Sequence, residues 1–581
     1  MFVLGERLNE WRQGHGKLNV KEYQIESLSD PEISRLLDLL DKHAELGALS
    51  PLPKDLQFAA IKQKHGKELL VALREATEGK SFDAILEDEF RGIKSLTARR
   101  LYLAVCCFHQ HGAFARDALL AQLLNVPLTQ LYEETSAGTE GVIIYECVNQ
   151  AREAYAARAR HRTIASVVWE RCASAEEKDA LLRRALSSLN LNYGIDADAF
   201  ESFIRNDHTI DQIRTLDGKI RFFETACKKD PDSPYVRQHY ARMLMREEKS
   251  DLALGQIDLA IKMDPKVRVL HHTCGMVLIQ LTLSVDSDDI ARRRLAQSEA
   301  SFRRGLARYS RDEYCYQGLA QLYLGWAKRA PTSEESTEYV MKAEQVVNEG
   351  LKQVQVRYGL WIESSNIEAY LGNEPSRLQA LEQAVRDTPG SIVSRYLLGR
   401  AYRKAGRIDD ALRVLEPIIK DHHDEFRSFV EFALCLAIKN KSYEESIAVL
   451  KLSTLYGYSD PRFIATLGGM LFMSGKFSEA KAIFEESTKR DFTSEEMNKI
   501  QFCPWVMEDP NAPLRMNGKV AKRQAGYAFV ECKGFPGFLC PGSKFDGLVM
   551  NVGMTVSFEP VFSARGALAI APMNIGASAD S

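Results

Sequence analysis

Small residues and prolines recur at fixed intervals between residues 226 and 487, and this rhythm constrains the fold more than any other feature. Pro231 and Pro265 stand 34 residues apart. A short side chain lets two helix axes approach closely, and a proline stops a helix because it lacks an N–H. Steps of 12 or 7 residues link the positions that we expect at helix contacts: Ala241, Ala253, Ala260, Gly399, Ala411, Gly468 and Ala480.

This pattern resembles the tetratricopeptide (TPR) repeat, in which each unit of about 34 residues is a pair of antiparallel helices. The resemblance covers residues 196–500 and suggests about eight helical hairpins. It implies an α–α superhelix that binds a protein or another macromolecule in its groove and carries no chemistry of its own. The long spacing between Gly275 and Ala300 predicts longer helices or loops at that point.

Aromatic and histidine side chains of the repeats could face this groove. The positions concerned are Tyr235, His239, His271, His272 and Tyr396. Adjacent histidines on a helix point to different faces, so His271 and His272 do not suggest a metal pair. Packing or surface roles are the favoured interpretation of all five.

Composition excludes several classes of protein. The 581 residues carry a net charge of −3, so any attraction to nucleic acid must be local. The eleven cysteines form no CxxC motif, and the chain lacks a zinc-type cluster of Cys and His. The charged N-terminus does not resemble a signal peptide, and no apolar run of about 18 residues occurs. We expect a cytoplasmic protein without membrane contact, metal or cofactor.

The N-terminal third predicts helices first and then a small mixed domain. Residues 28–46 begin with a Ser/Asp cap and continue with leucines at helical spacing, and residues 67–77 are also amphipathic. Helices are expected near residues 96–108, 115–124 and 162–171, with strands at 142–146 and 155–159. This order suggests a winged helix-turn-helix. The apolar composition of residues 115–124 favours packing over DNA contact.

These segments are similar to the helical lid and winged helix of bacterial STAND NTPases, which also carry TPR-type sensors. The resemblance rests on GERLNEW, ISRLLDLLDKH, KELLVALREATEGKSFDAILEDEF and ARHRTIASVVWER, and it places a sensor-like arginine at Arg7. The phosphate-binding GxxxxGK[ST] loop of that family is missing, and Gly14–Lys17 is too short to replace it. We therefore expect no enzyme activity. A separate ATPase chain could supply the missing half, or the activity has been lost.

After residue 510 the sequence changes to short β-rich runs between glycines. Strands are expected at residues 518–522, 527–531, 537–540, 555–560 and 567–571, which suggests an OB-type barrel. The segment is similar to cold-shock domains through Gly518, Val520 and the run Gly526–Val530. In that family, exposed aromatic rings stack on the bases of single-stranded RNA or DNA.

Five residues of this module are candidate nucleic-acid contacts. Three rings are expected to stack on bases and two lysines to neutralise phosphates: Tyr527, Phe529, Phe538, Lys519 and Lys544. The alternative is that the same rings fill the barrel or cap the last repeat.

Together these features predict a mainly α protein: a TPR-type superhelix after a lid and winged-helix region, followed by a small OB-like β-barrel. The expected domains are residues 1–92 (lid-like), 93–195 (winged-helix-like), 196–500 (repeats) and 511–576 (cold-shock-like barrel). Two functional hypotheses follow. One is an interaction or sensor protein of a STAND-type signalling or defence system, and the other is a regulator that binds RNA or single-stranded DNA.

Overall fold

A computed structural model describes residues 28–575, except 44–45, 47–48, 51, 60, 63–81, 140, 150–153, 490–491 and 546. The structure is mainly helical and ends in a β-rich region, which confirms the predicted fold class. The chain forms two compact units. The first contains the described residues from 82 to 394. The second contains residues 28–62 and 395–575, within the same gaps.

The first unit opens with a small mixed domain. Its elements are α5 (Phe82–Gly92), α6 (Leu96–His109), β1 (Ala115–Arg116), α7 (Asp117–Leu124), α8 (Leu128–Gly138), β2 (Ile143–Asn149), β3 (Ala154–Ala159), α9 (Arg162–Cys172) and α10 (Ala175–Ser188). The strands form one sheet in the order β1-β3-β2, with antiparallel pairs throughout. Helices 96–108 and 162–171 and both predicted strands lie within a few residues of their expected bounds.

Helices α5 and α10, strand β1 and helix α8 had no predicted counterpart. Strand β1 occupies the start of the segment that we expected to be helical from residue 115, because Ala115 and Arg116 pair with Ala157 and Ala156. Helix α8 follows α7 after a left-handed residue, Asn125, which ends α7. Its sequence, LTQLYEETSAG, mixes polar and apolar residues without a strong helical period.

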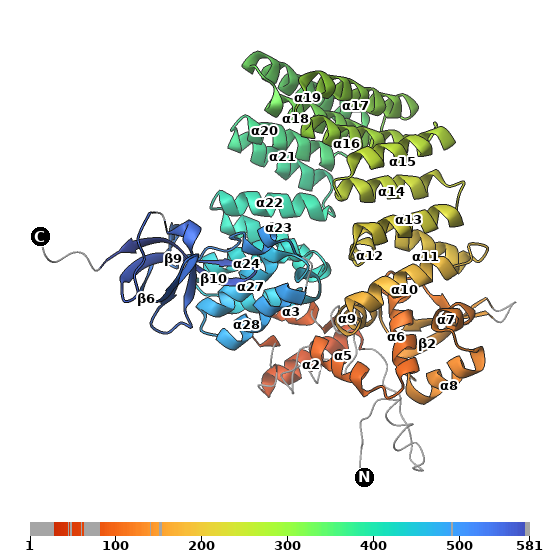
Figure 1. The fold of residues 1–581 in the computed structure, drawn as a ribbon, viewed down its shortest axis with the longest axis horizontal. Coiled ribbons are helices and arrows are strands. Elements are labelled where there is room, and N and C mark those ends of the chain that lie inside the picture. Colours follow the sequence, from red (N-terminus) through yellow and green to blue (C-terminus); the bar gives the residue numbers. More distant parts are fainter. Residues whose placement is uncertain are drawn as a thin grey trace, which may run out of the picture. The chain divides into compact units, whose positions relative to one another are not determined.

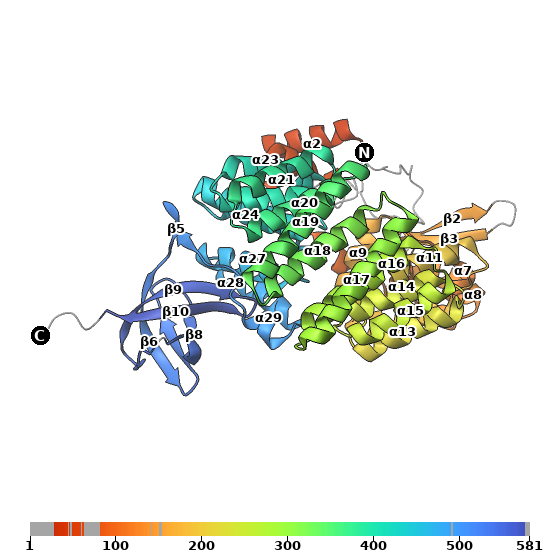
Figure 2. The ribbon, with the colours of Figure 1, turned by 90° about the horizontal axis from the view of Figure 1, so that it is seen from above.

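Helix pairs fill the rest of the first unit (Figures 1 and 2). They are α11 (Gly194–Arg205), α12 (Asp207–Asp211), α13 (Leu216–Lys229), α14 (Pro234–Arg246), α15 (Ser250–Met263), α16 (Arg268–Ser284), α17 (Asp288–Arg308), α18 (Glu313–Arg329), α19 (Ser333–Gln353), α20 (Tyr358–Tyr370) and α21 (Glu374–Asp387). The long spacing after Gly275 results from longer helices, because α16 has 17 residues and α17 has 21.

Glycines hold these hairpins together where a bulky side chain crosses the next helix. The buried Phe302 ring of α17 lies between Gly275 of α16 and Gly318 of α18. A Cβ atom at Gly275 would lie 2.5 Å from this ring, which is far inside van der Waals contact. One aromatic side chain therefore fills the space that two absent side chains leave, and it locks three helices in register.

The second unit begins with α2 (Asp30–Lys42) and α3 (Lys54–Ala59). Helix α2 starts as the sequence predicts, with Pro31 in its first turn and the Ser29 N–H donating to the Glu32 carboxylate at 2.7 Å. Helix α3 packs on the repeats, where Asp55 pairs with Lys420 at 2.6 Å. The expected helix at residues 67–77 and the sensor-like Arg7 lie outside the described residues.

Three more hairpins form the repeats of the second unit. Helix α22 (Ile392–Lys404) begins at the end of the first unit, and the others are α23 (Ile408–Asp421), α24 (Phe426–Asn440), α25 (Glu444–Lys451), α26 (Thr454–Gly457), α27 (Pro461–Met473), α28 (Phe477–Glu486) and α29 (Ser494–Asn498). We call α22, α24 and α27 the first helices of this unit, and α23, α25 and α28 its second helices. Helices α24 and α25 form the middle hairpin of these three.

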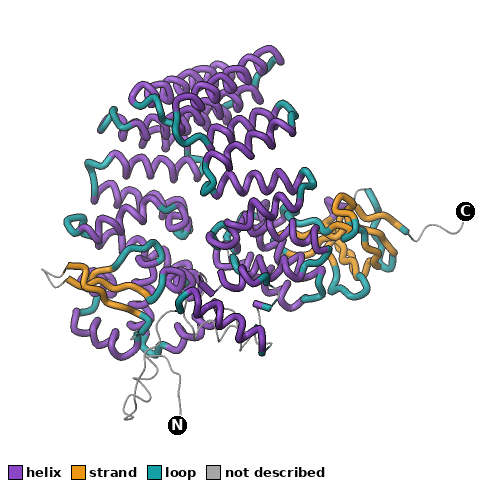
Figure 3. Tube along the Cα trace, turned by 180° about the vertical axis from the view of Figure 1, so that it is seen from behind, coloured by secondary structure: helices purple, strands orange, loops and turns teal. Residues whose placement is uncertain are grey.

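The C-terminal strands close into a barrel, drawn in orange beside the helices in Figure 3. Its strands are β6 (Met516–Gln524), β7 (Tyr527–Glu531), β8 (Phe538–Pro541), β9 (Thr555–Ser563) and β10 (Gly566–Asn574), in the order β10-β8-β7-β6-β9. The β8–β10 pair is parallel and the other pairs are antiparallel. The segment before the barrel contains an antiparallel pair, β4 (Trp505–Val506) and β5 (Asp509–Pro513).

An aromatic junction joins the barrel to helix α27. The Phe472 ring of α27 lies 5.6 Å from Phe535, 5.4 Å from Phe538 and 5.5 Å from Phe562, measured between ring centroids. The neighbouring Gly469 leaves room for this approach, since a Cβ atom there would lie 2.5 Å from Phe502. The last hairpin and the barrel therefore share one core.

The Phe302 contact gives a direct test of hairpin packing. Gly275→Ala should destabilise the protein by about 1–3 kcal/mol, because the added methyl group overpacks the Phe302 ring. Gly255→Ala is the matched control, because Gly255 lies in helix α15 with no atom within 4 Å of the added methyl group. This control should stabilise by about 0.5–1 kcal/mol through helix propensity. Thermal unfolding of both variants decides the point, and equal melting temperatures would contradict the packing argument.

Candidate functional site

The seven small residues expected at helix contacts are all buried. They lie on α14 (Ala241), α15 (Ala253, Ala260), α22 (Gly399), α23 (Ala411), α27 (Gly468) and α28 (Ala480). A Cβ atom at Gly399 would lie 2.5 Å from Leu415, and one at Gly468 would lie 2.6 Å from Phe484. These positions pack the helices of the repeats against one another.

A cluster of arginines surrounds one buried carboxylate on the first helices of the second unit. Glu431 of α24 is fully buried; its Oε2 accepts from Arg403 Nε at 2.7 Å and its Oε1 from Arg462 Nη2 at 2.6 Å. Arg400 Nε lies 3.7 Å from the same carboxylate. Arg400 and Arg403 come from α22 and Arg462 from α27, so three consecutive first helices meet at this point. We call these four residues the arginine cluster.

The electrostatics of the cluster keep Glu431 ionised. Burial alone would raise the pKa of its carboxyl, but Arg403 and Arg462 outweigh burial and hold the pKa below its ordinary value. One negative charge thus faces three guanidinium groups. The cluster keeps an excess of positive charge, and the side chain of Arg400 is 44% exposed.

These arginines were not predicted as functional residues, although the sequence contains a signal. Tyr396, Arg400 and Arg403 follow each other at steps of four and three, which places them on one face of α22. Of these, only Tyr396 was noted as a residue of the groove. Its hydroxyl is hydrogen-bonded to Arg462, which connects it to the cluster.

The corresponding helices of the first unit, α14, α16, α18 and α20, are connected by hydrogen bonds of amide side chains rather than by an arginine cluster. Gln238 of α14 donates to the Thr273 hydroxyl of α16 at 2.9 Å. Gln321 of α18 and Asn366 donate to the two oxygens of Glu363 on α20, at 2.5 and 3.0 Å. Burial raises the pKa of Glu363, against the effect of these two hydrogen bonds.

The histidine and tyrosine positions expected near the groove divide between surface and core. Tyr235 is 50% exposed, whereas His271 is buried with its Nε2 2.9 Å from the Pro265 carbonyl oxygen. Burial lowers the pKa of both His239 and His272 to about 4, so both rings are neutral at pH 7. Adjacent His271 and His272 have different neighbours, since His272 lies 5.9 Å from the Phe302 ring.

The barrel brings two of the expected aromatic residues together on its outer face. Tyr527 and Phe529 of β7 are in edge contact, with ring centroids 5.7 Å apart, and Phe529 is 40% exposed. Phe529 stands opposite Lys522 of β6 in the strand register. Lys519 and Lys544 are both exposed, on β6 and after β8.

The prediction that Phe538 stacks on a base is wrong, because its ring is fully buried and has no free face. Alternation along β8 explains the error. Phe538 pairs with the buried Val530 and points into the aromatic junction, whereas Leu539 pairs with the exposed Phe529 and points outward. The alternative, that some of these rings fill the barrel and meet the last repeat, holds for Phe538.

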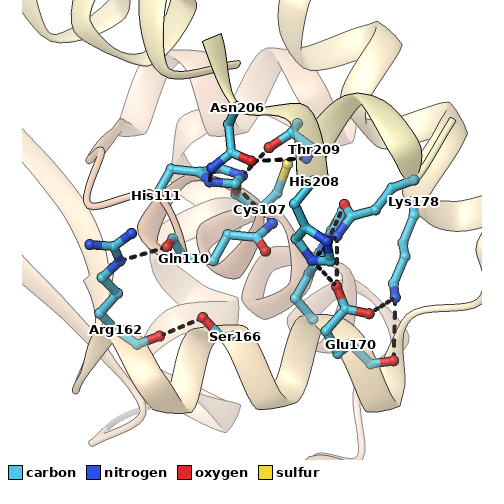
Figure 4. A network of polar contacts seen from close by, with 12 residues as sticks. Cys107, Gln110, His111, Arg162, Ser166, Glu170, Lys178, Asn206, His208 and Thr209 are labelled. Atoms are coloured by element: carbon cyan, nitrogen blue, oxygen red, sulfur yellow. Dashed lines mark hydrogen bonds and ion pairs between the residues drawn. The ribbon is translucent and has the colours of Figure 1, made fainter. Parts of the chain in front are cut away.

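A polar network connects the small domain with the first repeat helices (Figure 4). Glu170 of α9 accepts from Lys178 of α10 at 2.7 Å and from Gln212 at 2.6 Å, and it lies 3.0 Å from His208 of α12. Burial alone would raise the pKa of Glu170, but His208 and Lys178 hold it well below its ordinary value. The network is satisfied internally, which indicates a structural role.

A second part of this network surrounds His111. The Asn206 amide donates to His111 Nδ1 at 3.2 Å, so Nε2 carries the proton and donates to the Thr209 hydroxyl at 2.7 Å. Burial, with a smaller contribution from His208, lowers the pKa of His111 to about 3. This arrangement requires a neutral imidazole.

Comparison with known proteins finds a match to one part of the repeats. A family model described as tetratricopeptide repeat matches residues 378–430. No curated protein matches the chain.

Several solved repeat structures are similar to parts of the chain. A thermophilic TPR protein of Thermus thermophilus shares 19% identity over 35% of this chain and 99% of its own length, with a TM-score of 0.29. The PilF protein of Pseudomonas aeruginosa shares 12% sequence identity over 44% of this chain and 98% of its own length, with a TM-score of 0.26. YrrB, a TPR protein with an unusual peptide-binding site, shares 14% sequence identity over 40% of this chain and 90% of its own length, with a TM-score of 0.18.

Neither a membrane-spanning helix nor a metal cluster occurs in the part of the chain that the structure describes. Within these residues, no helix combines the length and apolar character that a membrane span requires. The same residues contain no group of three or more His, Cys, Asp or Glu side chains placed to hold a metal ion.

The neutral His111 predicts an acid-sensitive first unit. The ordinary pKa of histidine is about 6.5, so between pH 6.5 and 3 the unfolded chain binds a proton that the folded His111 does not. The free energy of unfolding should therefore decrease as the pH is lowered from 6.5 to 3, by up to about 1.4 kcal/mol per pH unit from this residue. His111→Gln should reduce that slope in thermal unfolding measured from pH 7 downward. The exposed His422 provides the control variant His422→Gln, which should keep the parent slope, and an unchanged slope in His111→Gln would contradict the prediction.

Proposed function

We propose that this chain is a non-catalytic interaction protein that binds a partner protein along the first helices of its repeats. The observation that carries the proposal is the division of each hairpin. Apolar side chains and small residues are buried between the helices, whereas the outer sides of the first helices expose side chains that can contact a partner, such as Tyr235 of α14 and Arg400 of α22. Repeat arrays bind through such surfaces.

The resemblance of the N-terminal third to STAND proteins extends this proposal to a sensor. The order α6-β1-α7-α8-β2-β3 supports a winged-helix arrangement, and a TPR-type array follows it. In this proposal the repeats bind a trigger in the cytosol, while a separate ATPase chain acts on the signal. DNA contact is disfavoured, because α8 carries two glutamates and neither lysine nor arginine.

Site-specific photo-crosslinking tests the interaction function. A photoreactive residue in place of Tyr235 on α14 should capture a partner in extracts of the source cells, because this side chain is exposed on a first helix. The control position is Met341, which is 63% exposed on the second helix α19. Equal capture at both positions, or capture at neither, would reject a binding surface on the first helices. Mass spectrometry of the crosslinked species identifies the partner.

A second candidate function is binding of RNA or single-stranded DNA by the barrel, and a specific observation favours it. Tyr527 and the exposed Phe529 lie side by side on β7, with Lys522 opposite Phe529. The residues from 513 to 575 include seven Lys or Arg and three Asp or Glu, whereas the whole chain is acidic. The five-stranded closure with parallel β8 and β10 supports an OB-type, cold-shock-like assignment.

A double variant tests this second function. Tyr527→Ala with Phe529→Ala should weaken binding of a short labelled RNA by roughly tenfold or more, because each base–ring stack contributes about 1–3 kcal/mol. Val549→Ala is the control, since Val549 is 64% exposed but lies outside the strands of this face. Fluorescence anisotropy at about 50 and 200 mM salt gives both affinity and salt dependence. An unchanged affinity in the double variant, or no binding by the parent chain, rejects the proposal.

A further inference from the structure

Charge in the repeats of the second unit is segregated between the two helices of each hairpin. The first helices α22, α24 and α27 carry seven Lys or Arg and one Asp or Glu, a net charge of +6. The second helices α23, α25 and α28 carry four Lys or Arg and nine Asp or Glu, a net charge of −5. Some of these charges pair between the helices, as Lys439 of α24 does with Asp409 of α23 at 2.8 Å, and we call the outer side of the first helices the basic face.

The arginine cluster lies on this basic face. Glu431 is its sole acidic member, and both carboxylate oxygens are already used by Arg403 and Arg462. Arg400 therefore has no comparable partner in the cluster. Its Nε is buried and makes no hydrogen bond within the part of the chain that the structure describes. The rest of the Arg400 side chain reaches the surface, where it is 44% exposed and can meet an anion.

The parts of the Arg403 and Arg462 guanidinium groups that Glu431 does not contact can pair with further carboxylates. Each of Arg403 and Arg462 is fixed through one nitrogen by Glu431, and both side chains stay partly exposed, at 21% and 27%. A guanidinium is a planar fork that pairs with a carboxylate through two hydrogen bonds, and a side chain that is already fixed loses less entropy on binding. Three such groups on neighbouring first helices suit a chain segment with several carboxylates rather than one isolated ion.

The acidic side of the same hairpins has a different use. Helix α3 of the chain's own N-terminal segment packs against the second helix α23, where Lys420 pairs with Asp55 at 2.6 Å. The second helices carry nine Asp or Glu, and these carboxylates would repel an acidic partner. It would therefore be directed to the first helices by charge alone.

We propose that the basic first-helix face centred on Arg400, Arg403 and Arg462 binds a partner-protein segment rich in aspartate and glutamate. This inference rests on the proposed interaction function and specifies the chemistry of the partner. The segment lies across α22, α24 and α27, and its carboxylates pair with the arginines while Tyr396 lies alongside on α22.

Fluorescence anisotropy with the full-length chain tests the proposal. The probe is a fluorescein-labelled peptide that repeats Asp-Ser-Glu-Gly, and its partner probe has Asn and Gln in place of Asp and Glu. The acidic peptide should bind and the amide peptide should not. Raising the ionic strength should weaken the binding, because the contacts are charge pairs near the surface.

Two charge-reversal variants provide the matched comparison. Arg400→Glu should weaken binding of the acidic peptide by roughly tenfold or more, since it reverses the exposed charge and leaves both short pairs of Glu431 in place. Arg413→Glu makes the same charge change at a 74% exposed site on the second helix α23, and it should leave the affinity unchanged. Thermal unfolding verifies that both variants fold, and Arg400→Gln replaces Arg400→Glu if that variant does not.

Three results would overturn the proposal: no binding of the acidic peptide by the parent chain, equal weakening by both reversals, or binding of a uridine oligonucleotide that depends more strongly on Arg400 than peptide binding does. The last result would identify the ligand of this face as a nucleic acid. If the peptide fails while crosslinking at Tyr235 still captures a partner, the interaction function stands and the inference about acidic chemistry alone fails.

Discussion

Large apolar side chains pack against glycines, which have no side chain, and these contacts determine how the helices are spaced. Phe302 lies against Gly275 and Gly318, and Leu415 and Phe484 make the equivalent contacts with Gly399 and Gly468. Each contact removes the side chain that would hold two helices apart and fills the space with a single apolar group. The distance and rotation of successive hairpins follow from these contacts, and so does the alignment of their first helices. The proposed binding surface depends on that alignment, because it combines residues that are far apart in the sequence.

The repeats and the barrel strands were predictable because both depend on short-range patterns. Small residues at steps of 12 and 7 indicate helix contacts, and glycine-bounded runs of alternating residues indicate strands such as β7 and β9. Elements without such a pattern were missed. Strand β1 has two residues and forms because β3 offers a free edge, and α8 lacks a clear apolar period.

The candidate sites were harder to predict than the fold, because they depend on which face a side chain takes and on its neighbours. Phe538 was assigned to the surface from a motif, whereas alternation along β8 turns it inward. The arginine cluster combines residues 62 positions apart, and nothing local in the sequence connects Arg400 with Glu431 or Arg462. Spacing on α22 placed three residues on one face, but the buried carboxylate that organises them comes from another helix.

The aromatic junction of Phe472 with Phe535, Phe538 and Phe562 determines how independent the barrel can be. A terminal repeat ordinarily needs a polar outer surface to stay in solution, and α27 carries a phenylalanine there. The barrel therefore covers the end of the array. Either part expressed alone would expose the aromatic rings of the junction to water. A linker-like hinge is ruled out at this joint. A nucleic-acid strand bound on the outer face of β7 would therefore keep a fixed orientation to the last hairpin.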